Sequence, residues 1–317
     1  MKTHRSLRKG FTLIELLTAV AITTVIIAVL IGTTRMSMDA WKDSSDKARA
    51  SRLAKESIEV MARDLEGIVI RSGNDYEWLS IRMDDNEANG PTNAEIKNPL
   101  EFFFFSAPTD RYDGNIGTAD DEGGDISAVI YKLAYVDQLD PVGKTFPVFS
   151  LYRQLINPDE TFSKYLGKNN IVTGLLDSED VTGSSNFIAE NIYNFTVTLI
   201  FEFNNVTTGK MEQKRVPVMT SGTDFQEIRI TGRMVGKDNP STTSVPASQS
   251  PADIEDSSGN NVAASARLAG AELGILVLSD SAMRALNKKP FTDQAAFGNF
   301  VKENSHYFSK SVILPRP

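Results

Sequence analysis

The chain has 317 residues, of which 41% are hydrophobic and 17 are phenylalanine, enough to build a large core. Its formal net charge is −8, which argues against a nucleic-acid-binding surface, because such surfaces need clustered Lys and Arg. The absence of cysteine excludes disulfides, thiol catalysis and Cys-ligated metals. We therefore expect a protein stabilised by burial of apolar side chains, without a nucleic-acid partner.

The first 31 residues divide into a basic leader and an apolar segment. Residues 1–10 contain four Lys or Arg and no acid, and Phe11–Ile31 is apolar apart from Glu15 and four threonines. A segment of this length spans a bilayer as a helix, and the basic residues before it predict a cytoplasmic N-terminus and a translocated, periplasmic body. A plain membrane anchor gives the same pattern, but a carboxylate inside such a segment is costly unless it has a role.

The residues at the junction carry a family resemblance. The run Lys9-Gly10-Phe11-Thr12-Leu13-Ile14-Glu15 and the apolar stretch after it resemble the class III leader of the type IV prepilin and pseudopilin superfamily. The resemblance implies cleavage between Gly10 and Phe11 by a prepilin peptidase, with N-methylation of Phe11. It also implies that Glu15 pairs with the N-terminal amine of a neighbouring subunit in a fibre, which offsets part of the desolvation of both charges.

Two stretches beyond the leader resemble the J-type minor pseudopilins of type II secretion. They are Arg63–Arg71 and Ile188–Phe195. The resemblance implies a structural subunit of a short envelope fibre, at or near its tip, that contacts other pseudopilins through the N-terminal helix in the bacterial inner membrane. Two alternatives remain open, namely a minor-pilin adhesin with an enlarged head and a membrane-anchored periplasmic domain.

An enzyme is not expected. The sequence contains no Walker loop, no G-x-G-x-x-G and no H-E-x-x-H motif. After removal of residues 1–10 the chain retains a single histidine, His306. Ser279-Asp280-Ser281 offers a hydroxyl, but it lacks a nucleophile elbow, so a helix cap explains it better.

The expected fold class is α+β. We expect one long helix over 11–66, whose first half (11–31) spans the membrane or fills the fibre core. Its second half (32–66) is amphipathic, with apolar residues near i, i+4, i+7 spacing at Leu53, Ile58, Met61 and Leu65, and should pack on an antiparallel sheet. Residues 67–317 should form a periplasmic, pilin-like head.

Within the head the pattern alternates between strands and loops. We expect hairpins of 125–137 with 146–155 and of 189–204 with 214–219, a mobile Ser- and Pro-rich insertion over 237–261, and short helices over 279–286 and 291–302. Ser279 or Asp280 should cap the first helix and Thr292 the second. Further strands are expected over 77–83, 100–106, 226–235 and 271–278.

An oxygen-rich loop between 110 and 125 is a candidate calcium site, because Ca²⁺ takes six to eight oxygen ligands. The spacing does not match an EF-hand, and a solvated surface loop is the alternative; apart from this ion, no cofactor is expected. The candidate ligands are Asp110, Asp113, Asn115, Asp120, Asp121 and Asp125.

Three other features have a structural interpretation. The run Phe102–Phe105 is expected in the core as a strand covered on both faces, rather than as a partner-binding patch. Arg63 and Asp64 are expected to form an ion pair with the sheet or with another subunit. Trp41 and Trp78 are expected at the membrane interface and in the core, respectively.

Overall fold

The structure is a computed structural model with two compact units, Met1–Ala48 and Arg49–Pro317, which we describe separately. The helix α1, Leu13–Glu66, begins in the first unit and ends in the second. The residues that the structure describes are 11–83, 100–107, 125–137, 146–171, 181–218, 220–221, 224–225, 227–233, 235–238, 250–251, 254–288, 291 and 293–315.

The helix α1 confirms the predicted long helix, with a start two residues later. Its sequence contains no proline and one glycine, Gly32, so nothing in it interrupts the backbone hydrogen bonds. In its first part the hydroxyls of Thr18, Thr23 and Thr24 donate to backbone carbonyls one turn earlier, at 2.8–2.9 Å. These polar side chains therefore need no external partner, which suits apolar surroundings.

In the second unit one stripe of α1 is buried, as the amphipathic pattern predicts. The stripe combines small residues, which let the helix approach the sheet closely, with larger apolar ones. Its members are Ala50, Ala54, Ser57, Ile58, Met61, Ala62, Asp64 and Leu65.

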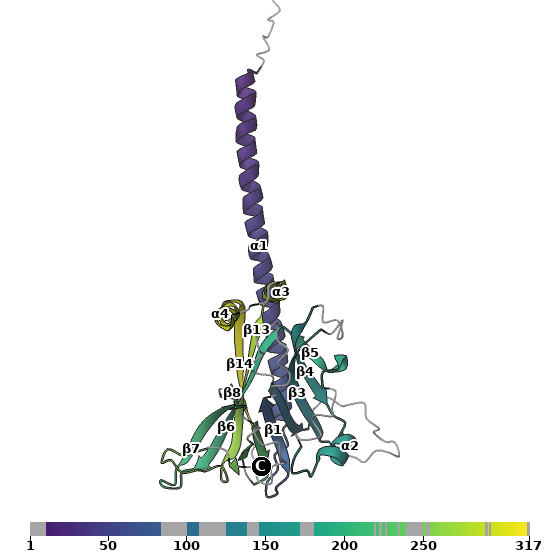
Figure 1. The fold of residues 1–317 in the computed structure, drawn as a ribbon, viewed down its shortest axis with the longest axis vertical. Coiled ribbons are helices and arrows are strands. Elements are labelled where there is room, and N and C mark those ends of the chain that lie inside the picture. Colours follow the sequence, from purple (N-terminus) through teal and green to yellow (C-terminus); the bar gives the residue numbers. More distant parts are fainter. Residues whose placement is uncertain are drawn as a thin grey trace, which may run out of the picture. The chain divides into compact units, whose positions relative to one another are not determined.

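The strands of the second unit form two main sheets (Figure 1). The larger sheet has eight antiparallel strands in the order β12-β11-β10-β1-β2-β3-β4-β5, and the smaller has four in the order β14-β13-β6-β7. Together with α1 these sheets confirm an α+β fold. The larger sheet consists of β1 (Glu77–Met83), β2 (Leu100–Ser106), β3 (Ser127–Val136), β4 (Val148–Leu155), β5 (Phe187–Glu190), β10 (Glu227–Thr231), β11 (Val235–Asp238) and β12 (Ser250–Pro251).

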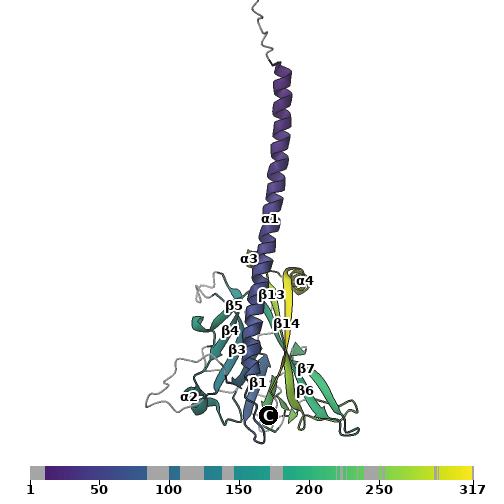
Figure 2. The ribbon, with the colours of Figure 1, turned by 180° about the vertical axis from the view of Figure 1, so that it is seen from behind.

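The smaller sheet confirms the second predicted hairpin, since β6 pairs with β7 around a turn at 205–210. Its strands are β6 (Ile192–Asn204), β7 (Met211–Val218), β13 (Arg267–Leu278) and β14 (Ser305–Ile313), and a separate two-stranded ladder joins β8 (Thr220–Ser221) to β9 (Asp224–Phe225). Figure 2 shows β13 and β14 running side by side, and the register pairs all nine residues of β14 with β13.

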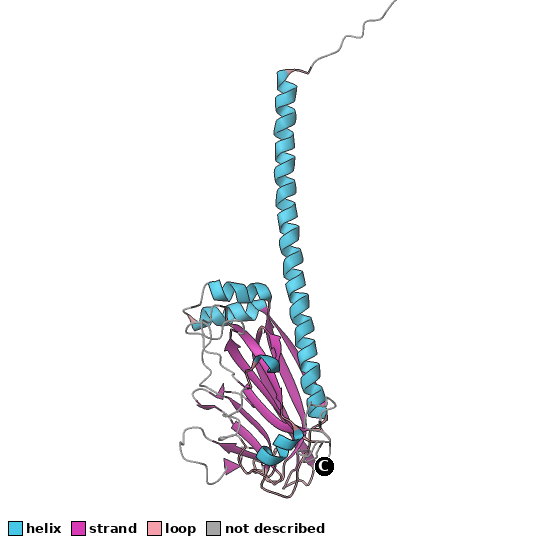
Figure 3. Ribbon diagram, turned by 90° about the vertical axis from the view of Figure 1, so that its right-hand side faces the viewer, coloured by secondary structure: helices cyan, strands magenta, loops and turns pink. Residues whose placement is uncertain are grey.

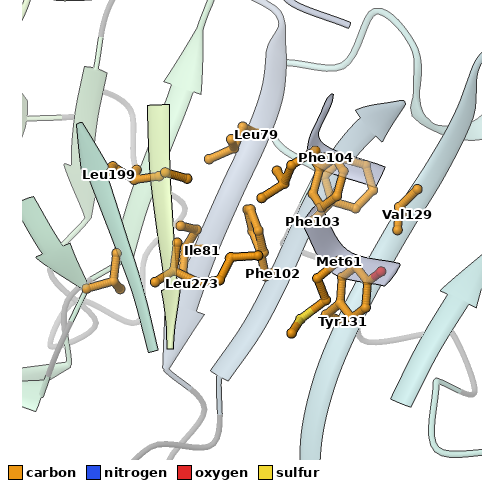
Figure 4. Packing of buried hydrophobic residues seen from close by; sticks show 14 of the residues in the cluster. Met61, Leu79, Ile81, Phe102, Phe103, Phe104, Val129, Tyr131, Leu199 and Leu273 are labelled. Carbon is orange, nitrogen blue, oxygen red and sulfur yellow. The ribbon is translucent and has the colours of Figure 1, made fainter. Parts of the chain in front are cut away.

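The run of four phenylalanines lies in the core, as predicted. Phe102 and Phe104 lie on the face of β2 that packs against α1. On the same face, Tyr131 of β3 packs beside Met61 of α1 (Figure 4). Phe103 points to the opposite face, where its ring centroid lies 5.9 Å from that of Tyr165. The larger sheet is therefore covered on both faces, which explains why polar and apolar residues do not alternate in this strand.

Two helices, α3 (Asp280–Lys288) and α4 (Gln294–Asn304), connect β13 to β14. Figure 3 shows them side by side at one end of the strands. They cover a second apolar cluster with the ends of β3 and β4, and this cluster includes Tyr135, Phe149, Leu278, Ala282, Met283, Leu286, Phe297 and Val301. The remaining short elements are α2 (Pro158–Glu160), the π-helix Thr161–Tyr165 and the 3₁₀-helix Ser184–Asn186.

The helix caps match the predictions in one case and differ in the other. Ser279 caps α3, because its Oγ accepts a hydrogen bond of 3.2 Å from the Ala282 N–H. The cap of α4 is Asp293, whose carboxylate accepts from the N–H groups of Ala295 and Ala296 at 3.1 and 3.3 Å. The predicted cap Thr292 was therefore wrong by one residue.

Two expectations for the second half of the head differ from the structure. The single strand predicted over 226–235 is a hairpin of β10 and β11 with its turn near Gly232. Within the insertion predicted over 237–261, residues 254–261 form a turn in which Ile254 is buried and the Asp256 N–H donates to the Asn260 carbonyl at 3.0 Å. This segment is packed because Ile254, Val262 and Ala263 bring apolar surface to the core.

Candidate functional site

The N-terminal end of α1 holds the described part of the predicted processing and assembly site. Gly10 lies outside the described residues. Phe11 and Thr12 precede the first helical residue, Leu13, and the Phe11 side chain is 89% exposed. Phe11, which would carry the new N-terminus, therefore lies outside the helix. A peptidase could bind this segment without first unwinding helical backbone.

Thr12 and Glu15 cap each other at this helix end. The Glu15 carboxylate accepts hydrogen bonds of 2.9 Å from both the N–H and the hydroxyl of Thr12. In return, the Thr12 hydroxyl accepts a hydrogen bond of 3.3 Å from the Glu15 N–H. This reciprocal pattern is a capping box, and it holds the carboxylate at the helix N-terminus, where the helix dipole favours a negative charge.

The first unit presents a continuous apolar surface. The large apolar side chains from Leu13 to Ile31 are 49–80% exposed, and α1 is long and apolar enough there to cross a membrane. Such a surface is unfavourable in water, so it requires lipid or other helices around it. Further along, Met36, Met38 and Trp41 are 66–76% exposed, which leaves the predicted interfacial role of Trp41 as a prediction.

In the second unit a buried ion pair fixes α1 to the larger sheet. The Asp64 carboxylate accepts hydrogen bonds from Nε and Nη2 of Arg153 at 2.7 and 2.8 Å, and a third from the Tyr131 hydroxyl. Burial, reinforced by the Asp64 charge, raises the pKa of Tyr131 well above its ordinary value, so this hydroxyl remains a donor. The predicted pairing of Asp64 with the sheet is confirmed, whereas Arg63 is exposed.

Sequence reasoning did not identify the partners of Asp64. Arg153 lies in β4 directly opposite Tyr131 of β3, on the face that packs against α1. The sequence does place Arg153 on the same face of the strand as Leu151 and Leu155. An arginine at such an inward position indicates a buried acidic partner, because a buried charge needs one. The sequence spacing alone does not indicate which carboxylate it meets.

A second polar cluster ties the start of this unit to the sheets. Arg49 of α1 donates to Glu190 at 2.6 Å and to Asp280 at 3.0 Å. The same Asp280 accepts from the side-chain amide of Asn191 at 2.6 Å. Asn191 has a positive φ of 64° between β5 and β6, a conformation that asparagine tolerates better than most residues. The cluster therefore joins α1, the β5–β6 connection and α3.

The other candidate chemistry receives no support from the described residues. Of the six calcium candidates only Asp125 is described, and it is exposed; the other five lie outside, so calcium binding stays a prediction. Among the residues that the structure describes, no group of three or more His, Asp or Glu side chains is arranged to hold a metal. Ser279 caps α3, and His306 lies in β14 opposite Val277.

Comparison with known proteins identifies the N-terminal region. Residues 5–31 match the family model of the prokaryotic N-terminal methylation motif. No curated protein and no solved structure matches the chain. The match covers residues 5–10 of the leader, the Gly10–Phe11 junction, Glu15 and the whole apolar segment. The J-type resemblance of the head is therefore not confirmed.

Proposed function

We propose that this chain, which carries the class III prepilin leader of pilin-like proteins, is a structural subunit of a short envelope fibre. A prepilin peptidase cleaves it between Gly10 and Phe11 and methylates the Phe11 amine. The single observation that carries the proposal is the methylation motif at residues 5–31 directly joined to an exposed apolar helix surface. Proteins with this motif form a structural family, so the proposed role is assembly and not catalysis.

The proposed mechanism has a membrane stage and a fibre stage. The helix first anchors the chain in the inner membrane, with its N-terminus cytoplasmic and the unit Arg49–Pro317 periplasmic. The exposed apolar side chains of Leu13–Ile31 then exchange lipid for the helices of neighbouring subunits. In that fibre Glu15 would leave Thr12 and pair with the Phe11 amine of an adjacent subunit, because two opposite charges in an apolar environment stabilise each other.

The acidic charge of the head supports a role as a low-copy subunit of the fibre, at or near its tip. The mature chain, residues 11–317, carries 29 Lys or Arg and 41 Asp or Glu, a net charge of −12. A long run of identical acidic heads would accumulate repulsion at low ionic strength. A few copies among other pseudopilins would not.

The test of processing is mass spectrometry of the N-terminus after expression with a prepilin peptidase. The wild-type chain should begin at N-methyl-Phe11, and Gly10→Ala should retain Met1. Gly32→Ala is the matched control, because a Cβ at Gly32 meets nothing within 4 Å. An intact leader in the wild type, or cleavage within Ala19–Ala28, would reduce the protein to an anchored or secreted periplasmic domain.

A further inference from the structure

The head holds the helix α1 unevenly along its length. Residues 58–66 bury three large apolar side chains, those of Ile58, Met61 and Leu65, and the carboxylate of Asp64. Each large apolar side chain removes a substantial area from water, and the hydrogen bonds of Asp64 add a polar attachment. This end of α1 is therefore firmly fixed.

The part of α1 just before it, 49–57, contributes much less apolar surface. Its buried residues are Ala50, Ala54 and Ser57, and Leu53 is only partly buried. Small side chains allow the helix to lie close to the strands, but they remove little apolar area from water. Apolar packing alone therefore attaches this part of the helix weakly.

Arg49 supplies the polar attachment of this part. Among the described residues, it is the one side chain of 49–57 that donates hydrogen bonds to other elements, to Glu190 of β5 at 2.6 Å and to Asp280 of α3 at 3.0 Å. The Asn191 amide holds Asp280 in turn, at 2.6 Å. We name these four residues the Arg49 cluster. Figures 1 and 2 both show α3 next to α1, where this cluster lies.

Water and salt reach the Arg49 cluster. The exposed fractions of its charged side chains are 64% for Arg49, 34% for Glu190 and 21% for Asp280. In the ion pair at the other end of the attachment, 5% of Asp64 and 15% of Arg153 are exposed. Salt screens exposed ion pairs and screens buried pairs much less. High ionic strength should therefore weaken the attachment at 49 and spare the one at 64.

Ser57 marks a place where α1 can bend. Its hydroxyl donates to the carbonyl of Leu53, one turn earlier, at 2.9 Å. Such a bond competes with the N–H donor of the helix for the same carbonyl and often bends a helix. A bend of about 20° here moves Arg49, about 12 Å further along the axis, by about 4 Å. A hydrogen bond does not survive a displacement of this size.

We propose that the Arg49 cluster is a salt-sensitive latch on α1. When it opens, the helix bends at Ser57, residues 49–57 lift from the head and 58–66 stay in place. Three observations carry this proposal: an exposed ion cluster as the polar attachment, small side chains beneath the segment, and a helix-bending hydroxyl at its end. Opening changes the direction in which α1 leaves the head. Its use, to adjust the head as subunits join a fibre, rests on the proposed function, whereas the bend itself does not.

The test measures the exposure of two buried positions in the full chain in non-ionic detergent. Ala50→Cys reports on the lifting segment and Ala62→Cys on the fixed one, since both alanines are buried and the chain has no other cysteine. Raising NaCl from about 10 mM to about 1 M shortens the screening length from about 30 to about 3 Å. We expect the rate of alkylation by uncharged iodoacetamide to rise about fivefold at 50 and to stay unchanged at 62.

Three further variants assign the effect to the latch and the bend. Arg49→Met should give the fast rate at position 50 at every salt concentration, whereas Arg52→Met, at an exposed position one turn along, should behave as the wild type. Ser57→Ala should reduce the rise with salt, because it removes the bend-promoting hydroxyl. Spin labels at the exposed Ala48 and Ala285 leave the buried surface intact, and their distance distribution should broaden with salt.

Two kinds of result would overturn the proposal. The first is an alkylation rate at position 50, or a spin-label distance distribution, that neither salt nor Arg49→Met changes. The second is an equal acceleration at position 62, which would mean that the whole head unfolds. Cleavage at Gly10–Phe11 in these variants reports separately on the proposed function.

Discussion

The guanidinium of Arg153 in β4 donates two hydrogen bonds to the carboxylate of Asp64 in α1, at 2.7 and 2.8 Å. Both side chains are largely withdrawn from water, with 5% of Asp64 and 15% of Arg153 exposed. The Ser106 hydroxyl adds a bond of 2.7 Å to the Asp64 carbonyl. The last turns of α1 are thus held by β2, β3 and β4 at one point along the helix, which fixes its axial register on the sheet.

Removing one partner of this pair should destabilise the head strongly. We expect Arg153→Met to lower the free energy of unfolding by about 3–5 kcal/mol, because it leaves a buried carboxylate with one remaining side-chain donor, Tyr131. The double variant Asp64→Leu/Arg153→Met should recover most of that loss. Chemical denaturation of the full chain in detergent measures both, with exposed Arg63→Met as control, expected within about 0.5 kcal/mol. Equal losses in the single and double variants would contradict the assignment.

The loss of folding stability at alkaline pH should depend on Tyr135. Burial raises the pKa of its hydroxyl from 10.0 to about 12, and this hydroxyl donates to Asn287 at 3.1 Å. A pKa raised on folding gives a contribution that is fully present below pH 10 and is lost as the pH rises through 12. We expect the loss of stability between pH 10 and 12 to be smaller in Tyr135→Phe than in the wild type.

Thermal unfolding monitored by circular dichroism at pH 8, 10 and 11.5 tests this dependence. The exposed residue Tyr307 supplies the control Tyr307→Phe, which removes a hydroxyl without touching the second apolar cluster. Parallel alkaline losses in the wild type and Tyr135→Phe would show that another group sets the limit.

The sequence predicted the fold where the patterns are local, and it predicted less where contacts are distant. Four consecutive phenylalanines identified β2 as a doubly covered strand, and the apolar spacing identified the buried stripe of α1. The strand β14 was missed because Val312 is the one buried residue among its nine, and its exposed positions mix Ser309 and Ser311 with Tyr307 and Ile313. The turn at Gly232 was missed because the requirement for glycine there comes from a residue far away in the sequence. A Cβ added at Gly232 would lie 2.8 Å from the carbonyl oxygen of Asn74.

The N-terminal site was more predictable than the head because its function depends on a contiguous motif. Gly10, Phe11 and Glu15 stand within six residues, and the family match covers all three. The contacts of Arg49 with Glu190 and Asp280 join residues 141 and 231 positions apart in the chain. No local pattern contains such a pairing, so a single sequence does not reveal it.

Replacing Glu15 by glutamine should separate helix capping from charge. A glutamine amide oxygen can accept the same hydrogen bonds from Thr12, so the helix end and cleavage after Gly10 should remain as in the wild type. The charge needed to pair with a neighbouring Phe11 amine is lost. We expect Glu15→Gln to be processed normally, but to give about tenfold fewer crosslinks between apolar helices, a loss consistent with a charge-assisted hydrogen bond.

Mass spectrometry reports processing, and cysteine crosslinking at Ala19 in a chain that has no other cysteine reports helix contacts. Thr12→Ala is the complementary variant, since it removes the cap and retains the charge. If Glu15→Gln assembles as well as the wild type, the carboxylate acts only as a helix cap.

Acid should loosen the two hydrogen-bonded turns at 205–210 and 255–261 before it unfolds the rest of the head. Hydrogen bonds from the Ser257 hydroxyl and N–H lower the pKa of Glu212. Burial raises the pKa of Asp256, but bonds from the backbone and side chain of Asn260 and from other amides outweigh it, so that pKa is also lowered. A pKa lowered on folding gives stability that is present above the unfolded value, near 4, and is lost as the pH falls through the folded value.

We therefore expect amide exchange at Val206, Thr207 and Ser257, corrected for its intrinsic pH dependence, to show falling protection below about pH 4. Glu212→Gln should lose much of this pH dependence at Ser257, whose N–H donates to Glu212, because the glutamine amide cannot titrate. Glu303→Gln, at an exposed position in α4, controls for the removal of one acidic group. Protection that stays constant from pH 6 to pH 3 would mean that the turns are held by their backbone bonds and not by the two carboxylates. In that case the conformation of the two turns would be independent of pH.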